Sequence, residues 1–320
     1  MKQRRIGGPS GFDTSALCLG AMHFGTSTDE ATAFAVLDRF LEAGGTFIDT
    51  ANTYAFWVEG GTGEESEALI GRWLRSRGVR DQVKLATKVG ALPVPLDAPW
   101  PEAAEGLSKQ VIERQVKASL DRLGIDLIDV YYAHIEDRRT PLEETVAAFG
   151  ELVEHGTVRL LGCSNHAAWR IEQARALARQ LGVAGYSCVQ QRATYLQPRP
   201  GADFGANPHV SGELLDYVRS EPDLTLLGYS TLLGGALSRA DREVPQQYDH
   251  PGTPGRLSVL RQVADELGAS PNQVALAWHM HGSPSVLPVI GVSSVKQLED
   301  CLAAVDLELE AGQLERLNTA

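Results

Sequence analysis

Four side chains that could together move a proton stand at or just beyond the ends of three successive apolar runs. The runs 46–48, 83–87 and 127–133 are followed directly by Asp49, Lys88 and His134, and Tyr54 lies five residues beyond Asp49. An unpaired buried carboxylate is costly, so Asp49 needs a cation, and Lys88 is the candidate. The four residues form a candidate catalytic set if one fold brings these strand ends together.

The chemistry of such a set is general-acid catalysis. A tyrosine has an unperturbed pKa of about 10 and is a poor proton donor at neutral pH. A neighbouring ammonium lowers that pKa, so we expect Lys88 to tune Tyr54 while Asp49 keeps the lysine charged. A histidine can donate a hydrogen bond to a carbonyl oxygen or relay a proton. The set therefore suits protonation of a developing alkoxide.

Each residue taken alone has a structural explanation. Asp49 could cap a turn, Tyr54 could be a half-buried aromatic, Lys88 could be solvated, and His134 could be a hydrogen-bonded core histidine. Their joint placement at neighbouring strand ends favours the functional interpretation. The sequence has neither a nucleophile–base pair of the Ser-His type nor the cluster of strand-end acids typical of a magnesium site, so we expect no metal.

Composition excludes several other classes. The chain has 320 residues and a formal net charge of −12, which argues against a nucleic-acid or anionic-membrane surface. Its basic start is not followed by a signal-peptide core, and no apolar run is long enough to span a bilayer. Cys18, Cys163, Cys188 and Cys301 show no zinc spacing, so free cysteines in a cytoplasmic protein are expected.

Eight apolar segments predict buried strands: 16–20, 46–49, 83–88, 127–134, 158–163, 186–189, 224–228 and 286–290. Helical patterns separate nearly every pair, and this alternation predicts a parallel sheet. Eight such units in a chain of this length predict one closed (β/α)8 TIM barrel spanning 1–320. A short hairpin is expected before it, around 11–13, and long loops at 91–106, 196–207 and 232–252.

Helix starts are predicted from capping residues. Ser27 with Glu30 forms a candidate capping box, and Ser108 and Ser270 are candidate N-caps. Asn207-Pro208 is expected to open a further helix.

Polar residues follow the predicted strands at one end. In chain order they are Asp49, Lys88, His134, Asn165, Gln190 and Tyr229. Active sites of (β/α)8 barrels lie at the C-terminal ends of the strands. Scattered polar residues would not keep to that end, so the pattern predicts a site there.

The same residues carry a family resemblance. The stretch 49–54 reads Asp-Thr-Ala-Asn-Thr-Tyr, 87–88 reads Thr-Lys, 131–137 contains His134, and 161–165 reads Leu-Gly-Cys-Ser-Asn. The chain resembles the aldo-keto reductase superfamily nearly end to end. The resemblance implies a TIM barrel with long loops on its C-terminal face. It also implies Tyr54 as proton donor, Lys88 and Asp49 as tuners of its pKa, and His134 as the residue that orients the substrate carbonyl.

The resemblance further implies a nicotinamide cofactor. Its carboxamide is expected at Ser164, Asn165 and Gln190, its ring on Tyr229, and its pyrophosphate at Ser230, Leu232 and Gly234. The first loop is expected to contribute Gly20, Ala21 and Met22. The segment for the 2′-phosphate is expected to comprise Gly291, Ser293, Lys296, Gln297 and Asp300.

The chain departs from the commonest family pattern at three places. Ser293 stands where many relatives have a basic residue, Cys301 stands where asparagine is common, and 191–193 is unusual. The resemblance implies NADPH as the cofactor, and these departures leave NADH possible. Phe56, Trp57 and Trp100 on the long loops are the candidate substrate pocket and suit an apolar or ring-bearing carbonyl compound.

Two functions of different class remain open. The first is NADPH-dependent reduction of an aldehyde or ketone to an alcohol, by hydride transfer from nicotinamide C4 with Tyr54 as proton donor. The alternative is a cofactor-sensing regulatory subunit similar to the potassium-channel β subunits. A barrel lyase or isomerase with Lys88 as a Schiff-base lysine is more remote. The substrate, product stereochemistry and oligomeric state stay open.

Overall fold

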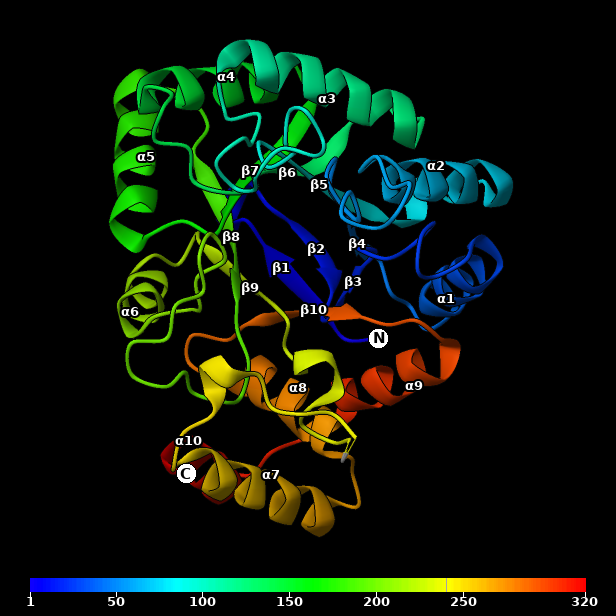
Figure 1. The fold of residues 1–320 in the computed structure, drawn as a ribbon, viewed down its shortest axis with the longest axis vertical. Coiled ribbons are helices and arrows are strands. Elements are labelled where there is room, and N and C mark those ends of the chain that lie inside the picture. Colours follow the sequence, from blue (N-terminus) through cyan, green and yellow to red (C-terminus); the bar gives the residue numbers. More distant parts are fainter. Residues whose placement is uncertain (240) are drawn as a thin grey trace.

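A closed barrel of eight parallel strands forms the centre of the molecule (Figure 1). The structure is a computed structural model and describes residues 1–239 and 241–320. The barrel strands are β3 (Cys18–Gly20), β4 (Phe47–Asp49), β5 (Lys84–Val89), β6 (Ile128–Ala133), β7 (Val158–Ser164), β8 (Tyr186–Arg192), β9 (Thr225–Tyr229) and β10 (Leu287–Gly291). The predicted TIM barrel is confirmed.

Helices surround the barrel on its outside (Figure 1). They are α1 (Glu30–Glu42), α2 (Glu65–Arg77), α3 (Lys109–Leu123), α4 (Leu142–Glu154), α5 (Ala168–Leu181), α6 (Gly212–Ser220), α7 (Thr253–Leu267), α8 (Pro271–His281), α9 (Val295–Ala303) and α10 (Ala311–Thr319). The helix α7 packs against α8 and α10 at the edge of the molecule (Figure 1). Within the described residues, none of these helices has the length and apolar character needed to cross a membrane.

Strand periodicity aims the candidate catalytic side chains into the barrel. Phe47, Ala86 and Tyr132 belong to the buried cluster of the barrel interior. Successive side chains of a strand point to opposite faces, so residues two positions further on share the same face. Those residues are Asp49, Lys88 and His134, each at the C-terminal end of its strand.

An N-terminal hairpin closes the opposite end of the barrel (Figure 1). It consists of β1 (Gln3–Ile6) and β2 (Phe12–Ser15), which pair antiparallel. Ile6 and Phe12 pack into the barrel-interior cluster. The backbone N–H of Gly7 donates to Thr225 Oγ1 at 3.0 Å, at the first residue of β9. The expected hairpin is confirmed, and it leaves the C-terminal face open.

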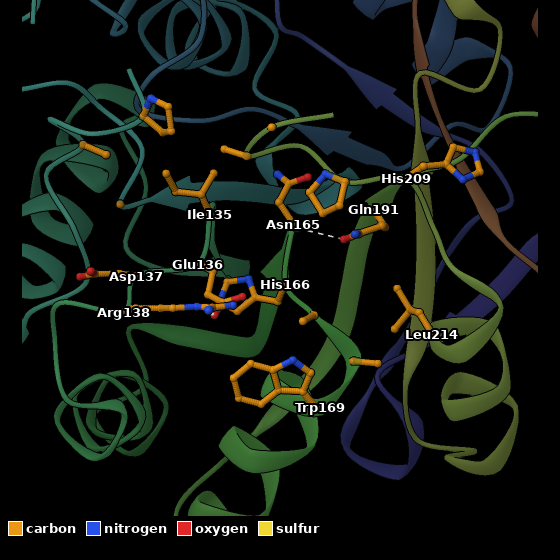
Figure 2. A pocket seen from close by; sticks show the side chains of 18 of the residues that line it. Ile135, Glu136, Asp137, Arg138, Asn165, His166, Trp169, Gln191, His209 and Leu214 are labelled. Atoms are coloured by element: carbon orange, nitrogen blue, oxygen red, sulfur yellow. Dashed lines mark hydrogen bonds and ion pairs between the residues drawn. The ribbon is translucent and has the colours of Figure 1, made fainter. Parts of the chain in front are cut away.

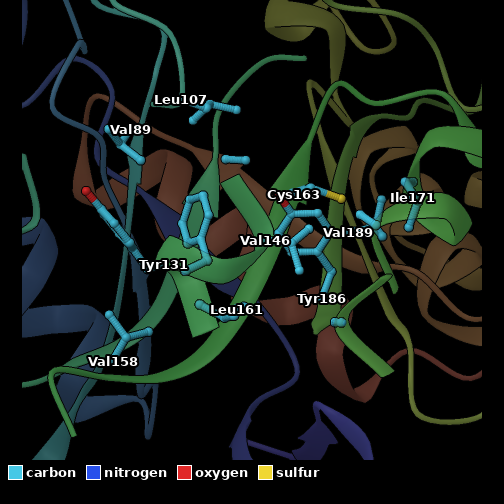
Figure 3. Close-up of a cluster of buried hydrophobic side chains, with 14 of the residues drawn as sticks. Val89, Leu107, Tyr131, Val146, Val158, Leu161, Cys163, Ile171, Tyr186 and Val189 are labelled. Atoms are coloured by element: carbon cyan, nitrogen blue, oxygen red, sulfur yellow. The ribbon is translucent and has the colours of Figure 1, made fainter. Parts of the chain in front are cut away.

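A second layer of core lies between the strands and the outer helices. Figure 3 shows one part of it, where side chains of β5 to β8 meet those of α4 and α5. Tyr131 is fully buried there and its ring centroid lies 5.7 Å from that of Phe149. The outward-facing residues of the strands are thus as apolar as the inward-facing ones, which is why these segments read as continuous apolar runs.

Two predicted helix starts are wrong. The N-cap of α1 is Asp29, not Ser27, because Asp29 Oδ1 accepts the backbone N–H of Thr32 at 2.9 Å. The helix expected at Asn207-Pro208 begins only at Gly212, because residues 207–210 are held against β8, where the N–H of Val210 donates to the carbonyl of Arg192. The predicted N-caps Ser108 and Ser270 are confirmed, Ser270 within a capping box.

We expect Ser270→Ala to destabilise the fold more than Ser211→Ala. Both serines accept a backbone N–H as helix N-caps, but Ser270 also donates to Asp300 at 2.9 Å. The loss of a cap costs about 0.5–2 kcal/mol, and Ser270→Ala loses a further bond. Urea denaturation of the two variants measures the difference in unfolding free energy. Equal losses would show that the Asp300 contact contributes nothing.

Candidate active site

The buried amine of Lys88 organises the site. Its Nζ donates to Asp49 Oδ2 at 2.5 Å, to Tyr54 Oη at 2.6 Å and to the carbonyl of Thr50 at 2.8 Å. An ammonium has three N–H donors, and these three bonds use all of them. Lys88 and Asp49 are both almost fully buried. The expected pairing of the two charges is therefore present, and the amine is held in one position.

The carboxylate of Asp49 receives three donors. Its Oδ2 accepts from Lys88 and from the hydroxyl of Tyr54 at 2.9 Å, and its Oδ1 accepts from Gln190 Nε2 at 2.8 Å. Gln190 lies on β8, on the opposite side of the barrel from β4. A side chain expected at the cofactor carboxamide thus also fixes the candidate catalytic carboxylate.

The pKa of Tyr54 is raised, not lowered as the sequence suggested. Burial is the main cause, and the negative charge of Asp49 together with its hydrogen bond to the phenol is the next. Burial also lowers the pKa of Lys88, against the opposing effect of Asp49. The phenol therefore keeps its proton at neutral pH. This is the form that an acid needs, and the Lys88 N–H is already in place to stabilise the oxygen once the proton leaves.

His134 lies next to the phenol. The ring centroids of Tyr54 and His134 are 5.9 Å apart at an interplanar angle of 77°. Burial, and then the charge of Lys88, hold the pKa of His134 well below its usual value. The imidazole is therefore neutral and has one N–H to donate, which suits orientation of a carbonyl and not proton delivery.

Asn165 links the catalytic residues to the neighbouring strand ends. Its Nδ2 donates to the carbonyl of His134 at 3.0 Å and to Ser164 Oγ at 3.1 Å. Its Oδ1 accepts the hydroxyl of Tyr229 at 2.7 Å, and its backbone N–H donates to Gln191 Oε1 at 3.1 Å, the bond drawn in Figure 2. The residues expected around the nicotinamide are therefore brought together on β7, β8 and β9.

Backbone strain is concentrated around the same residues. Among the described residues other than glycine, a positive φ occurs at Ala55, Asn165, Ser230 and Leu233. Ala55 follows Tyr54 directly, and Leu233 lies between Leu232 and Gly234. Non-glycine residues in this region cost free energy and persist where the surrounding structure imposes them, commonly at functional sites.

The segment expected at the cofactor phosphates lies at the start of α9. Ser294 caps this helix, and the N–H and hydroxyl of Ser293 both bond Gln297 Oε1, at 2.8 and 3.1 Å. Lys296 is exposed and forms no ion pair within the described residues. A helix N-terminus with a free cation beside it fits a phosphate group.

The carboxylate of Asp300 is hydrogen-bonded to other residues of the fold. It accepts from Ser270 Oγ, Gln273 Nε2 and Asn272 Nδ2, at the N-terminus of α8. Cys301, its neighbour, is buried against the core. The end of α9 is therefore shaped by packing, and a cofactor role for Asp300 stays a prediction.

The first loop lies beside β4. Gly20 is paired with Asp49 in the barrel, the N–H of Ala21 donates to the Asp49 carbonyl at 2.8 Å, and Met22 is 40% exposed. Gly291 of β10 pairs with Gly20 of β3. The cofactor residues expected on these two strands therefore lie next to each other on the C-terminal face.

A cavity of about 620 Å³ opens beside this arrangement (Figure 2). It lies between the loops that follow β5, β6, β7 and β8, and Ile135 and Asn165 contribute to its wall. Ile135 follows His134 directly in the chain, but Asp49, Tyr54, Lys88 and His134 are not themselves among the lining residues.

The aromatic residues expected to form the substrate pocket do not line this cavity. Phe56 and Trp57 pack edge to face with their ring centroids 5.2 Å apart, and Trp57 is 53% exposed. Trp100 packs on Ala91 and Ile135, and its indole N–H donates to the Ala91 carbonyl at 2.9 Å. Their contact with substrate stays a prediction.

No group of three or more His, Cys, Asp or Glu side chains suited to hold a metal ion is found in residues 1–239 and 241–320. The polar groups of the site are instead bonded in one network around Asp49 and Asn165. The four cysteines are free and buried.

The sequence matches the aldo/keto reductase family over residues 16–320. The chain belongs to this family. It is 35% identical to an uncharacterised oxidoreductase of Bacillus subtilis, over 97% of this chain and 93% of that protein. It is also 35% identical to a norsolorinic acid reductase of Emericella nidulans, over 94% of this chain and 76% of that protein. An aldo-keto reductase of Strobilurus tenacellus is 30% identical over 94% and 81%.

This aldo-keto reductase therefore belongs to a family of carbonyl-reducing oxidoreductases that generally use NAD(P)H and act on small carbonyl compounds. Most residues of the cavity wall were not singled out from the sequence, among them His166 and Trp169. The sequence could have indicated His166 only by its position in the chain, because it directly follows the strand-end residue Asn165.

We expect the rate of carbonyl reduction to be insensitive to the titration of His134. Because its pKa is held well below the usual value, the imidazole takes up no proton between pH 8 and 6. At saturating cofactor, kcat/KM should stay level across this interval in the wild type and in His134→Gln. An inflection near pH 6.5 in the wild type that disappears in the variant would show that His134 acts as a protonated acid.

Proposed function

We propose that this aldo-keto reductase catalyses NADPH-dependent reduction of an aldehyde or ketone to an alcohol, with Tyr54 as the proton donor. The observation that carries the proposal is the position of the phenol. Its oxygen accepts from Lys88 at 2.6 Å, and its hydroxyl donates to Asp49 at 2.9 Å. A carbonyl oxygen that takes the place of Asp49 as acceptor receives the proton by rotation of one hydroxyl.

The protein's part in the reaction is to hold and release this proton. When bound, the nicotinamide supplies a hydride to the carbonyl carbon. His134, as a neutral donor, orients the carbonyl oxygen toward Tyr54, and the alkoxide that develops is protonated by the phenol. Lys88 then stabilises the phenolate through the hydrogen bond it already makes, so little reorganisation accompanies charge development.

The contacts of the cofactor are proposed on the same face. Gln190 Oε1, Ser164 and Asn165 suit an amide group, Tyr229 suits a flat ring, and the strained segment 230–234 suits a pyrophosphate. Ser293, Lys296 and Gln297 at the start of α9 suit the 2′-phosphate, and this favours NADPH. Asp300 is left out of the proposed set because its carboxylate is bonded to α8.

An apolar rim supports an apolar substrate. Five of the large hydrophobic residues that are exposed in the described part of the chain follow the C-terminal ends of barrel strands: Met22, Trp57, Val94, Leu96 and Trp169. Exposed apolar residues gathered in one region commonly mark a binding site. We therefore propose that the carbonyl compound carries substantial apolar surface.

We expect Tyr54→Phe to slow the chemical step by roughly 10²- to 10⁴-fold, the range typical of a lost general acid. Lys88→Met should be comparably damaging, because the phenolate loses its cation. The double variant should be little worse than either, since both changes act on one proton transfer. Single-turnover hydride transfer at saturating NADPH measures the step.

The matched control is Tyr131→Phe. It removes a hydroxyl group of β6 that lies in the core between the barrel and the outer helices. Its rate should stay within about twofold of the wild type, since surface or unbonded groups away from the site contribute little. Cofactor affinity should survive in Tyr54→Phe. Near wild-type turnover by Tyr54→Phe would remove the basis of the proposal.

We expect NADPH to bind more tightly than NADH, and Lys296→Ala to reduce this preference. A charge-assisted contact from an exposed lysine is worth roughly five- to tenfold in affinity. Fluorescence titration gives both dissociation constants, with Lys117→Ala on α3 as control, because Lys117 is also exposed. Equal affinities for the two cofactors in the wild type would contradict the proposed phosphate contact.

A further inference from the structure

The cavity beside the active site is lined by His166, whose Nε2 makes no hydrogen bond to the described residues. His166 is 5% exposed, and its Nδ1 lies 2.7 Å from the carbonyl oxygen of Ser164. A carbonyl can only accept, so Nδ1 must carry the ring proton, and Nε2 is left with a lone pair. Within the described part of the chain, Nε2 has no hydrogen-bond partner. Nε2 is not fully enclosed by protein, so it can be reached from the cavity and is available to a ligand.

The imidazole keeps this form at neutral pH. Burial lowers the pKa of His166, against the opposing effects of its bond to Ser164 and of the charge of Glu136. The neutral tautomer set by Ser164 is therefore the species that faces the cavity. A ligand group that donates a hydrogen bond is complementary to it, and a second acceptor is not.

The charges beside His166 are paired with one another. Glu136 and Arg138 both line the cavity, and Glu136 forms ion pairs with Arg138 at 2.5 Å and with Arg170 at 3.9 Å. Figure 2 shows the side chains of Glu136 and Arg138 beside that of His166. A carboxylate or phosphate oxygen placed at Nε2 would meet a lone pair, whereas a hydroxyl group can donate a hydrogen bond to it.

The remaining wall suits a flat ring system. Trp169 stands at the outer edge, 52% exposed, with the guanidinium of Arg138 5.4 Å from its ring centre. Ile135 and Leu214 line the cavity on other sides (Figure 2). The volume of about 620 Å³ falls within the usual range of small-molecule sites, and it accommodates two or three fused rings.

We propose that this cavity binds the substrate and that His166 selects it: a flat, ring-bearing aldehyde or ketone with a hydroxyl group that donates to His166 Nε2. The inference rests on the proposed reductase activity for the reacting end of the molecule. The carbonyl end lies toward His134 and Asn165, and the hydroxyl-bearing end lies toward His166 and Trp169. His166 acts as a specificity residue and takes no part in the proton transfer.

Matched probes test the proposal. We use 6-hydroxy-2-naphthaldehyde and its 6-methoxy analogue, which keeps the ring system but cannot donate. The wild type should favour the hydroxyl compound in kcat/KM by at least about fivefold, because the ether cannot donate a hydrogen bond to Nε2. In His166→Phe the ratio should fall to about one. The ratio cancels any general loss of activity in the variant.

Two further variants test whether the ratio of the two kcat/KM values depends on His166 itself. His166→Gln should restore part of the preference, since its amide N–H can serve Ser164 and its amide oxygen can accept from the substrate. His155→Phe replaces an exposed histidine after α4 and should keep the wild-type ratio. A wild-type ratio near one, or an unchanged ratio in His166→Phe, would overturn the proposal.

Binding without turnover separates the two proposals. The affinities of 2-naphthol and 2-methoxynaphthalene are measured by quenching of tryptophan fluorescence. The naphthol should bind more tightly to the wild type and lose this advantage in His166→Phe. If this holds while no aldehyde is reduced, the reductase proposal fails and the binding site stands. If benzaldehyde is reduced with NADPH but the naphthol has no advantage, only the role of His166 fails.

Discussion

The buried ion pair of Lys88 and Asp49 is the interaction on which the site depends. Two charges removed from water are tolerated only when their remaining hydrogen-bonding capacity is satisfied, and removing one partner of such a pair commonly costs about 3–5 kcal/mol. Here every N–H of the ammonium has an acceptor, and the carboxylate receives donors from β5, β8 and the loop of Tyr54. The pair thereby connects strands that are far apart in the sequence and holds the phenol by both its donor and its acceptor function.

The barrel and the inward direction of the catalytic set follow from local patterns. Alternating strand and helix signals predict the architecture, and the period of two along a strand carries Asp49 and Lys88 inward from Phe47 and Ala86. The N-caps Ser108 and Ser270 could also be predicted from the sequence, because the hydrogen bond of an N-cap joins residues that are close in the chain. The start of α6 was not, since the preceding residues are held by a backbone contact to β8 that the local sequence does not encode.

The same distinction applies to the site. That an acid, a lysine and a tyrosine meet could be predicted from strand ends, but the pKa of Tyr54 could not. Its direction depends on how deeply the phenol is buried and on the charge of Asp49 and its hydrogen bond to the phenol, and the tertiary structure determines both. The cavity escaped prediction for a similar reason. It is formed by loops from four strands, and a residue such as His166 has no distinguishing local pattern.

The hairpin β1–β2 has a consequence for how such a molecule can diversify. Because its Ile6 and Phe12 pack into the barrel interior at one end, the candidate site and the cavity lie at the other end. The loops of that end contribute the cavity wall, whereas the charged pair is held by strands and by the Tyr54 loop. Changes in loop length or composition between β5 and α3, or between β8 and α6, can thus alter which molecules are admitted while the proton donor keeps its surroundings. The residues that select the substrate can therefore change independently of the residues proposed to transfer the proton.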